Sequence, residues 1–500
     1  MKSGGLPFSS VTPFSSVTQF SSVNQFSSVN QFIRTTIIAL ASVLLLAACT
    51  KEPLKPVTVH LVGDSTMADK PDPANNPERG WGQLLPEFFN DLVTVRNHAV
   101  NGRSTKSFID EGKWYNVMQE VEPGDYVFIQ FGHNDQKEYD PDRYSNPYSD
   151  YRRNLEQMAL EVRKEGGHPV LLSSIVRRKF NNEGTLVDTH GPYPFMARYV
   201  AAGNGIPFID LQQRTGDLVR GLGPDRSAGL YLILEPGAWE MYPEGIVDNT
   251  HLNERGAREV AGMVARSVRE LGLSLAGYLD PAHAHPRVLV VVGGHSYDTT
   301  EFYNMLGSLA AFHFDSISHP DAHRLMASEY IYSYDAVMYY DFITGMPLKD
   351  SAIYLNLARR GMPMLFLHHA ICTFQKWDGY AELVGGKYTV EGFGNDPSEL
   401  SDYKHDLDLT ISVLDKQHPV TRGMEDFTIH DEGYSNLWIR EGVTPLLGTH
   451  HPDCSDTVGW VNRFDRSKVV YLIFGHDSQA YASRSFRQLL ANSLGWLSAE

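Results

Sequence analysis

The feature that most constrains the fold of this chain is an alternation of short apolar runs with longer amphipathic segments, which occurs in two separate stretches. Short runs rich in Val, Ile and Leu are typical of strands that are buried on both faces of a sheet. Amphipathic segments of helical length between such runs are typical of the helices that connect parallel strands. The sequence therefore predicts an α/β protein with two three-layer α/β/α domains and mainly parallel sheets.

The two stretches define the expected domain organisation. We expect a first domain over residues 57–277, a proline-containing linker over residues 278–286 and a second domain over residues 287–500. A chain of 500 residues also exceeds the length that one hydrophobic core usually serves. Both domains have a flavodoxin-like pattern, with predicted strands over residues 57–62, 92–96, 126–131, 170–174, 207–211, 287–292, 336–340, 362–367 and 469–474. Predicted helices span residues 82–89, 150–165, 194–202, 253–271, 300–311, 350–360 and 484–497.

Residues 1–49 are expected to lie outside both domains. A repeated Phe-Ser-Ser-Val unit over residues 7–32 is typical either of a translated repeat upstream of the true start or of a disordered leader. The apolar run over residues 37–48 is too short to span a bilayer and is typical of a secretion signal. Its Leu-Ala-Ala-Cys ending resembles a bacterial lipobox, which implies lipidation of Cys49, an outer-membrane location on either face and a tether over residues 50–56. A plain signal peptide or a buried helix is the alternative.

The net charge of −17 argues against nucleic acid and anionic membrane surfaces as partners. We therefore expect no nucleic acid partner, and membrane contact through the lipid anchor only. An acidic polysaccharide needs only a local basic patch and is compatible with this charge. Beyond the lipobox, Cys372 and Cys454 could form a disulfide in an oxidising compartment or remain buried thiols.

Four short segments carry the residue types that acyl transfer requires. They are residues 63–66 (Gly-Asp-Ser-Thr), 101–104 (Asn-Gly-Arg-Ser), 132–135 (Gly-His-Asn-Asp) and 248–251 (Asp-Asn-Thr-His). The first three follow predicted strands, and the fourth lies on the loop predicted before the helix over residues 253–271. Because functional residues of parallel sheets gather at the carboxyl ends of the strands, we expect all four segments at one edge of the first sheet.

The chemistry of these segments assigns a role to each candidate residue. A serine hydroxyl becomes a nucleophile when a base takes its proton, and His251 is the base that we predict for Ser65. Asp248 can orient His251 and stabilise its imidazolium form. The backbone N–H groups of Ser65 and Gly102 and the side-chain amide of Asn134 are the predicted donors of an oxyanion hole. Helix-cap, turn or surface roles are the alternatives for single residues, but the four segments together favour catalysis.

Residues 57–272 resemble the SGNH (GDSL-type) hydrolases, and within them the rhamnogalacturonan acetylesterase-like branch. The resemblance rests on the four segments above and on residues 80–83 (Gly-Trp-Gly-Gln), 97–100 (Asn-His-Ala-Val) and 177–178 (Arg-Arg). It implies removal of acetyl groups from a pectic polysaccharide by a triad of Ser65, Asp248 and His251, without a metal or other cofactor. It also implies that His133 supports the site and is not the base.

Basic and aromatic residues near the same sheet edge are candidates for substrate binding. Arg177 and Arg178 end the fourth predicted strand, and their planar guanidinium groups could bind galacturonate carboxylates. A run of charge is as often a solvated surface, however. Trp81, Trp114 and Tyr115 could stack on sugar rings, but aromatic residues lie more often in the core.

The second domain has its own candidate residues. His295 follows the first predicted strand of this domain, His368 and His369 follow the third, His476 follows the last, and Glu432 is expected on a loop. Together they could form an acid–base or ligand pocket, or they could be ordinary hydrogen-bonded loop residues. No pair of them has the spacing that is typical of a zinc site, so we expect no metal.

This second half resembles the ThuA-like (trehalose-utilisation) domains, which are relatives of the class I glutamine amidotransferases. The resemblance rests on residues 382–388, 418–421, 431–434 and 475–477. It implies the fold and a link to carbohydrate metabolism, but it does not specify a reaction. The sequence lacks the Gly-x-Cys-x-Gly nucleophile elbow of the amidotransferases, so glutamine hydrolysis is not expected.

These inferences predict a serine carboxylic ester hydrolase that acts on an acetylated plant cell-wall polysaccharide or oligosaccharide, with rhamnogalacturonan as the expected substrate. One alternative is an esterase of the same family that acts on another acetylated glycan, such as xylan or peptidoglycan, or on a lipid ester. A second alternative is a glycan-binding first domain beside a catalytic ThuA-like domain.

Overall fold

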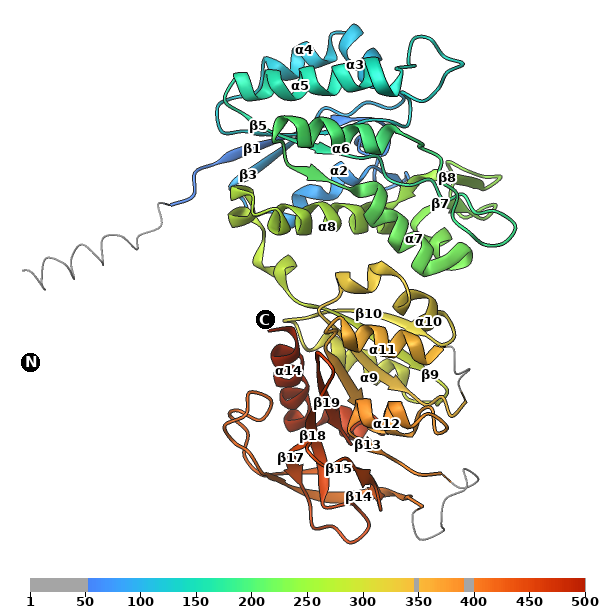
Figure 1. Cartoon of the computed structure of the whole chain (residues 1–500), viewed down its shortest axis with the longest axis vertical. Coiled ribbons are helices and arrows are strands. Elements are labelled where there is room, and N and C mark those ends of the chain that lie inside the picture. The colour runs from blue at the N-terminus through green and yellow to red at the C-terminus, as the bar shows by residue number, and fades with distance from the viewer. Residues whose placement is uncertain (1–52, 346–349, 391–399, 500) are drawn as a thin grey trace, which may run out of the picture. The chain divides into compact units, whose positions relative to one another are not determined.

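The computed structural model describes residues 53–345, 350–390 and 400–499. Two α/β regions follow one another along the chain, the first beginning at Val57 and the second at Arg287 (Figure 1). The expected α/β class is therefore confirmed. The predicted leader and lipobox, including Cys49, lie outside the described residues.

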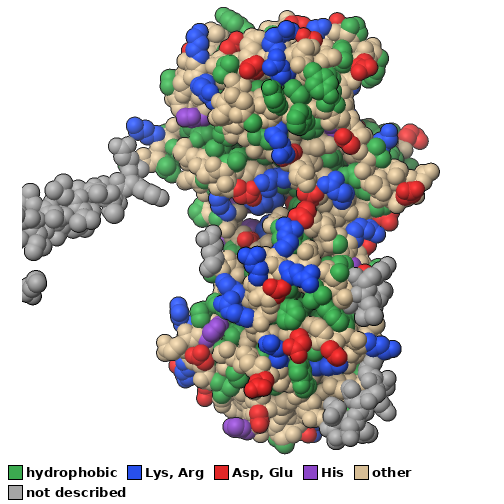
Figure 2. Space-filling model, in the orientation of Figure 1, with side chains coloured by type: hydrophobic (Ala, Val, Ile, Leu, Met, Phe, Trp, Pro, Cys, Tyr) green, Lys and Arg blue, Asp and Glu red, His purple; other side chains and the backbone are tan. Residues whose placement is uncertain are grey.

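The surface and the interior have the chemical character of a globular protein. On the face shown in Figure 2, basic and acidic side chains are interspersed with polar and apolar ones. Within the described part of the chain, no helix combines the length and the apolar character needed to cross a membrane.

Cys372 and Cys454 are both buried and free. Of the two alternatives for these cysteines, a disulfide or buried thiols, the structure therefore shows buried thiols.

The first region is built on a parallel sheet. The strand order is β3-β1-β4-β5-β6, and every pair of neighbours is parallel. The five strands predicted for this region are all present: β1 (Val57–Gly63), β3 (Val93–Asn97), β4 (Tyr126–Gln130), β5 (His168–Leu172) and β6 (Phe208–Ile209). Strand β1 lies between β3 and β4, so the segments that follow these three strands meet at one edge.

The first region has three layers, because alternate side chains of its strands point to opposite faces of the sheet and helices cover both faces. Tyr126 and Phe128 of β4 belong to one hydrophobic core, whereas Val127 and Ile129 belong to another. Both cores are covered by helices, which explains why the residues on both faces of the strands are apolar. One core packs against α3 (Thr105–Asp110), α4 (Lys113–Met118), α5 (Arg152–Lys164) and α6 (Tyr193–Asn204), and the other against α2 (Trp81–Leu84), α7 (Leu211–Ser227) and α8 (Glu254–Glu270) (Figure 1).

An antiparallel hairpin that the sequence did not predict carries the fourth candidate segment, residues 248–251. Strand β7 (Tyr231–Leu234) pairs with β8 (Ile246–Asn253), and β8 also pairs with the short β2 (Glu78–Arg79). Asp248 and His251 therefore lie on a strand and not on the predicted loop. The strand escaped prediction because β8 is mostly polar and only partly buried.

The second region has a mixed sheet in the order β10-β9-β11-β12-β19-β18-β17-β14-β15. The strands from β10 to β19 are parallel, and all of them except β10 were predicted. The strands from β19 to β15 are antiparallel. The antiparallel part was missed because such strands need not be continuously apolar; β14, for example, alternates buried and exposed residues toward its end. The strands are β9 (Arg287–Gly293), β10 (His313–Ser318), β11 (Ala336–Asp341), β12 (Met364–Leu367), β14 (Asp402–Val413), β15 (Phe427–Ser435), β17 (Thr444–Gly448), β18 (Thr457–Phe464) and β19 (Ser467–Leu472).

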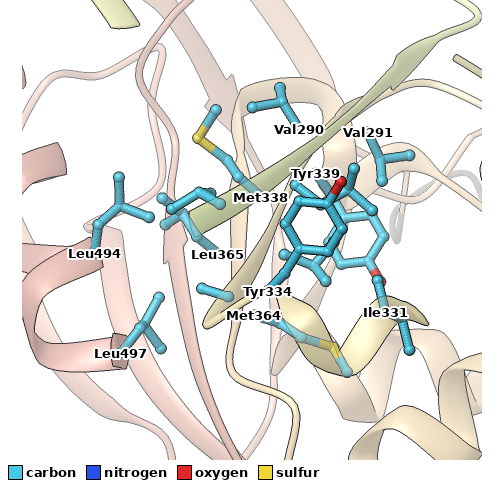
Figure 3. Close-up of a cluster of buried hydrophobic side chains, with 14 of the residues drawn as sticks. Val290, Val291, Ile331, Tyr334, Met338, Tyr339, Met364, Leu365, Leu494 and Leu497 are labelled. Atoms are coloured by element: carbon cyan, nitrogen blue, oxygen red, sulfur yellow. The ribbon is translucent and has the colours of Figure 1, made fainter. Parts of the chain in front are cut away.

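Neighbouring residues of the parallel strands face opposite layers in this region as well (Figure 3). Met338 and Leu365 lie on the side of Leu494, whereas Tyr339 lies on the other side. The Tyr339 ring stacks on that of Phe366, with ring centroids 4.7 Å apart. The helices around this sheet are α9 (Thr299–Gly307), α10 (Asp321–Met326), α11 (Ser351–Arg359), α12 (Asp378–Val384), α13 (Ser478–Ala482) and α14 (Arg484–Ser498).

Candidate active site

A tight turn after β1 presents Ser65 at the carboxyl edge of the first sheet. The buried Asp64 carboxylate accepts hydrogen bonds from the backbone N–H (3.0 Å) and the hydroxyl (2.8 Å) of Thr66. The Thr66 hydroxyl accepts from the side-chain amide of Gln130, the last residue of β4 (2.8 Å). Trp81 donates its indole N–H to the Gln130 side-chain oxygen (2.9 Å). The position of Ser65 therefore depends on a buried chain of hydrogen bonds within the sheet edge.

Trp81 is a core residue and does not reach the surface. Its side chain is fully buried, and its backbone N–H donates to the Thr66 carbonyl (2.9 Å). A Cβ atom at Gly80 would lie 2.1 Å from the Ala68 carbonyl oxygen, so only glycine allows this close approach. The Gly-Trp-Gly-Gln segment thus supports the serine turn, and the sugar-stacking role considered for Trp81 is wrong. Trp114 is likewise buried in the core.

Ser65, His251 and Asp248 form a hydrogen-bonded chain. Nε2 of His251 lies 2.9 Å from the Ser65 hydroxyl oxygen, and Nδ1 of the same ring lies 2.6 Å from one carboxylate oxygen of Asp248. The other Asp248 oxygen accepts the backbone N–H groups of Thr250 (2.7 Å) and His251 (3.0 Å). A single strand thus fixes both the base and its carboxylate. In this arrangement a serine can pass its proton to a histidine.

Electrostatics suit this pair to general base catalysis. Burial alone would raise the pKa of Asp248, but the hydrogen bonds and the charge of His251 outweigh burial and lower this pKa to about 2. Burial alone would lower the pKa of His251, but the hydrogen bond and the charge of Asp248 outweigh burial and raise this pKa above its ordinary value. Asp248 therefore stays ionised at neutral pH, and His251 gains affinity for the serine proton.

The segments that carry the predicted oxyanion donors are bound to one another. The N–H of Val100 donates to the Gly63 carbonyl (3.1 Å), which brings the loop of Gly102 next to the serine turn. Gly102 has a left-handed backbone (φ 78°), which favours glycine. One N–H of the Asn134 amide donates to the Arg103 carbonyl (3.0 Å), and the amide has a second N–H for an oxyanion. The assignment of these donors to an oxyanion hole stays a prediction, which this arrangement favours.

Arg177 and Arg178 lie in different environments. Arg177 is half-buried and donates to the His133 carbonyl oxygen (3.2 Å). The guanidinium of Arg178 donates to the side-chain oxygens of Asn249 (2.7 Å) and Ser227 (3.1 Å). Because Asn249 lies on β8, Arg178 holds the strand of the triad in place. Arg177 is therefore the better candidate for contact with a substrate.

Two lysines near the triad escaped the sequence reasoning. Nζ of Lys137 donates to the side-chain oxygen of Asn134 (2.7 Å), and Nζ of Lys70 donates to that of Asn101 (2.8 Å). Lys70 is buried and pairs with Glu78 at 2.8 Å. Their place within a few residues of the catalytic segments is the signal that could have identified them.

His133 is part of a buried histidine pair. Its Nδ1 lies 3.0 Å from Nε2 of His190. Burial, together with neighbouring positive charge, lowers the pKa of both rings, that of His190 to about 3. Both rings are therefore neutral at ordinary pH, and the pair agrees with a supporting role for His133.

The second region brings its predicted candidate residues to one place. Nε2 of His368 lies 3.3 Å from Nδ1 of His476 and 3.6 Å from a carboxylate oxygen of Glu432. The His295 ring stacks on His369, with centroids 4.4 Å apart. Glu432 lies on strand β15 and not on the predicted loop, because the antiparallel half of the sheet was not foreseen. Burial lowers the pKa of His368 to about 3.

Comparisons with known proteins match each region separately. The family described as GDSL-like lipase/acylhydrolase matches residues 61–259, and the ThuA family, described as trehalose utilisation, matches residues 287–497. A rhamnogalacturonan acetylesterase of Bacillus subtilis is 43% identical over 225 residues, which are 45% of this chain and 95% of that protein. A probable rhamnogalacturonan acetylesterase of the same organism is 33% identical over 217 residues, which are 43% of this chain and 94% of that protein. The match to the solved structure of a putative ThuA-like protein from Parabacteroides merdae covers 43% of this chain and 90% of that protein's chain. The two are 15% identical, and the TM-score is 0.37.

The electrostatic coupling of the triad predicts a pH effect. The base must be neutral to accept a proton, so kcat/KM for an acetyl ester should rise with pH through a value above about 6.5, the ordinary pKa of histidine. Asp248→Asn removes the interactions that raise the pKa of His251 and leaves burial, which lowers it. The acid limb of the profile should therefore move to lower pH, and kcat should fall by about 10³–10⁴-fold.

Asp91→Asn, at an exposed turn, is the matched control and should leave the profile unchanged. An Asp248→Asn enzyme with wild-type kcat and an unmoved acid limb would contradict the role of Asp248.

Proposed function

The chain joins a member of the GDSL-like lipase/acylhydrolase family to a ThuA domain, and we propose that the first of these removes acetyl groups from an acidic cell-wall polysaccharide of the rhamnogalacturonan type. The observation that carries the proposal is the hydrogen-bonded chain from Ser65 through His251 to Asp248. This chain lies in the region that is similar to the rhamnogalacturonan acetylesterases.

The geometry supports a two-step acyl transfer. In the first step the Ser65 oxygen attacks the acetyl carbonyl carbon while Nε2 of His251 takes the serine proton. His251 then gives this proton to the sugar oxygen as the C–O bond breaks, which leaves an acetyl group on Ser65. In the second step a water molecule attacks the acetyl carbonyl, with His251 again as base, and acetate leaves as Ser65 regains its proton. The ionised Asp248 stabilises the imidazolium form in both steps.

Donors at the sheet edge support stabilisation of the oxyanion. The backbone N–H groups of Ser65 and Gly102 and the free N–H of the Asn134 amide would bind the negative charge that develops on the carbonyl oxygen. Lys137, whose Nζ lies 2.7 Å from the Asn134 side-chain oxygen, orients this amide so that its N–H groups face away from the lysine.

Local positive charge supports an acidic substrate. The chain has a net charge of −17, yet basic side chains gather beside the triad. Arg177, Arg178 and Lys179 line an open pocket of about 430 Å³ that also includes Asn249 of the catalytic strand. Carboxylates of a galacturonate-containing chain are the complementary groups. A neutral glycan such as xylan would gain nothing from these charges.

The alternative of a glycan-binding first domain requires that the triad be inactive. Its hydrogen bonds are complete at 2.6 Å and 2.9 Å, and the serine is half-buried and therefore reachable. A binding module would not need a carboxylate that raises the pKa of a histidine next to a serine. The geometry therefore favours catalysis by the first domain.

Acetate release from acetylated rhamnogalacturonan by the full chain tests the proposal. Ser65→Ala removes the nucleophile and should lower the rate by at least about 10⁴-fold. Ser149→Ala, at an exposed serine, is the matched control and should retain the wild-type rate. Release that survives Ser65→Ala would contradict the mechanism. Turnover of a small acetyl ester that depends on Ser65, without release from rhamnogalacturonan, would contradict the substrate and retain the chemistry.

The proposed location is the outer membrane, with the protein anchored by a lipid on Cys49. The proposal is supported by the Leu-Ala-Ala-Cys ending of the apolar run over residues 37–48. In cells that produce the full chain, labelled palmitate should enter the wild type and should not enter Cys49→Ser. Equal labelling of the two proteins would contradict the anchor.

A further inference from the structure

A cluster of ligand-type side chains lies at the carboxyl edge of the second sheet. His368 follows β12, His476 follows β19, and Glu432 lies on β15. His368 and Glu432 are buried, and His476 is partly exposed. The three residues are far apart along the chain, which is why their spacing did not predict a metal site.

The distances among the three side chains fit a single bound ion. Nε2 of His368 lies 3.3 Å from Nδ1 of His476 and 3.6 Å from Oε1 of Glu432, and Nδ1 of His476 lies 3.5 Å from Oε2 of Glu432. A tetrahedral ion with ligands at about 2.0–2.1 Å separates its ligand atoms by roughly 3.3–3.4 Å. The candidate ligand atoms all lie within 4.8 Å of one another.

Hydrogen bonds from outside the cluster orient two of its members. Nδ1 of His368 donates to the Ile473 carbonyl oxygen (2.7 Å), which leaves the lone pair of Nε2 directed toward the cluster. The buried Asp431 accepts the backbone N–H groups of Gly475 (2.8 Å) and His476 (3.0 Å). It thereby fixes the loop that carries His476. Partners of this kind are typical of the groups that hold metal ligands in place.

The Glu432 carboxylate is held by histidines. Nδ1 of His405, a residue that sequence reasoning missed, lies 2.6 Å from Oε2 of Glu432. The Tyr434 hydroxyl lies 3.1 Å from Nε2 of His368 and adds a further polar group to the centre. Burial of a carboxylate requires compensation by positive charge, and a divalent cation between Glu432 and the rings of His368 and His476 would supply it.

The cluster borders a pocket that a ligand of the ion could enter. The pocket has a volume of about 300 Å³, and its walls include Glu432, His405, His295 and His369. Within the described residues, both ring nitrogens of the buried His369 have no hydrogen-bond partner. Buried polar groups are normally paired, so an unpaired ring at a pocket wall points to a polar ligand.

We propose that His368, His476 and Glu432 bind one divalent first-row transition-metal ion, with an open coordination position toward this pocket. Two imidazoles and one carboxylate are a ligand set that such ions use, and three protein ligands leave a position for water or for a substrate oxygen. The proposal is independent of the esterase site, and it replaces the sequence-based expectation that this domain binds no metal.

Metal binding by the full chain tests this proposal. After treatment with a chelator, the protein is dialysed against Zn²⁺, Mn²⁺ or Ni²⁺, and the bound metal is measured by mass spectrometry. At least one of these ions should bind at one ion per chain and raise the midpoint of thermal unfolding. His476→Ala and Glu432→Gln should each weaken this binding by more than about 100-fold, because loss of a ligand costs more than the 10–100-fold that loss of a partner behind a ligand costs.

Two further variants control for binding elsewhere. His430→Ala removes a histidine of β15, the strand of Glu432, and the ring of this histidine lies 2.9 Å from the Asp408 carboxylate. Ser65→Ala removes the proposed esterase nucleophile. Both should bind the ion like the wild type. His476 is partly exposed, so its replacement should leave the fold intact, which circular dichroism checks. Failure of the wild type to bind any of the three ions, or equal binding by the wild type and His476→Ala, would overturn the proposal.

Discussion

Parallel strands present all their carboxyl ends at one edge of a sheet, and both candidate sites of this protein depend on that constraint. In the first sheet, Ser65 follows β1 and Asn134 follows β4, the neighbouring strand. In the second sheet, His368 follows β12 and His476 follows β19, which is again the neighbouring strand. Residues that are distant in sequence thus meet because the strands before them pair. In each site an antiparallel strand then adds the remaining groups, β8 in the first region and β15 in the second.

Buried polar groups hold the serine in place before any substrate binds. The chain from Trp81 through Gln130 and Thr66 to Asp64 lies inside the domain, where an unpaired polar atom is costly. Each of these links resists displacement, so the turn that presents Ser65 has little freedom. If the candidate oxyanion donors and His251 are already in position, they need not reorganise during the reaction. Such preorganisation is the main source of electrostatic catalysis. The stability of the sheet edge and the activity of the serine therefore share one set of interactions.

The sequence predicted the strands that are continuously apolar. It failed for strands whose formation depends on partner strands that are distant along the chain. The buried strands of the first sheet and the grouping of Ser65, Asp248 and His251 followed from local pattern. The strand β8 did not follow from local pattern, because it is polar. It is a strand because it pairs with β2 and β7. For Trp81 the sequence left both a sugar-binding and a core position open, because an indole suits either, and only its burial distinguishes the two. His405 was missed because it lies on a strand whose alternating pattern, Leu407 onward, was not recognised.

The proposed mechanism requires that Ser65 carry the acetyl group during turnover. The most direct measurement is to quench the full chain in acid during turnover of an activated acetyl ester, digest it and locate the acetyl group by mass spectrometry. If Ser65 is the nucleophile, the wild type should yield an acetylated peptide that contains Ser65, and this acetylated peptide should be absent from Ser65→Ala. An acetyl group on a different residue, or a burst of product without any acetylated peptide that contains Ser65, would contradict the proposed mechanism.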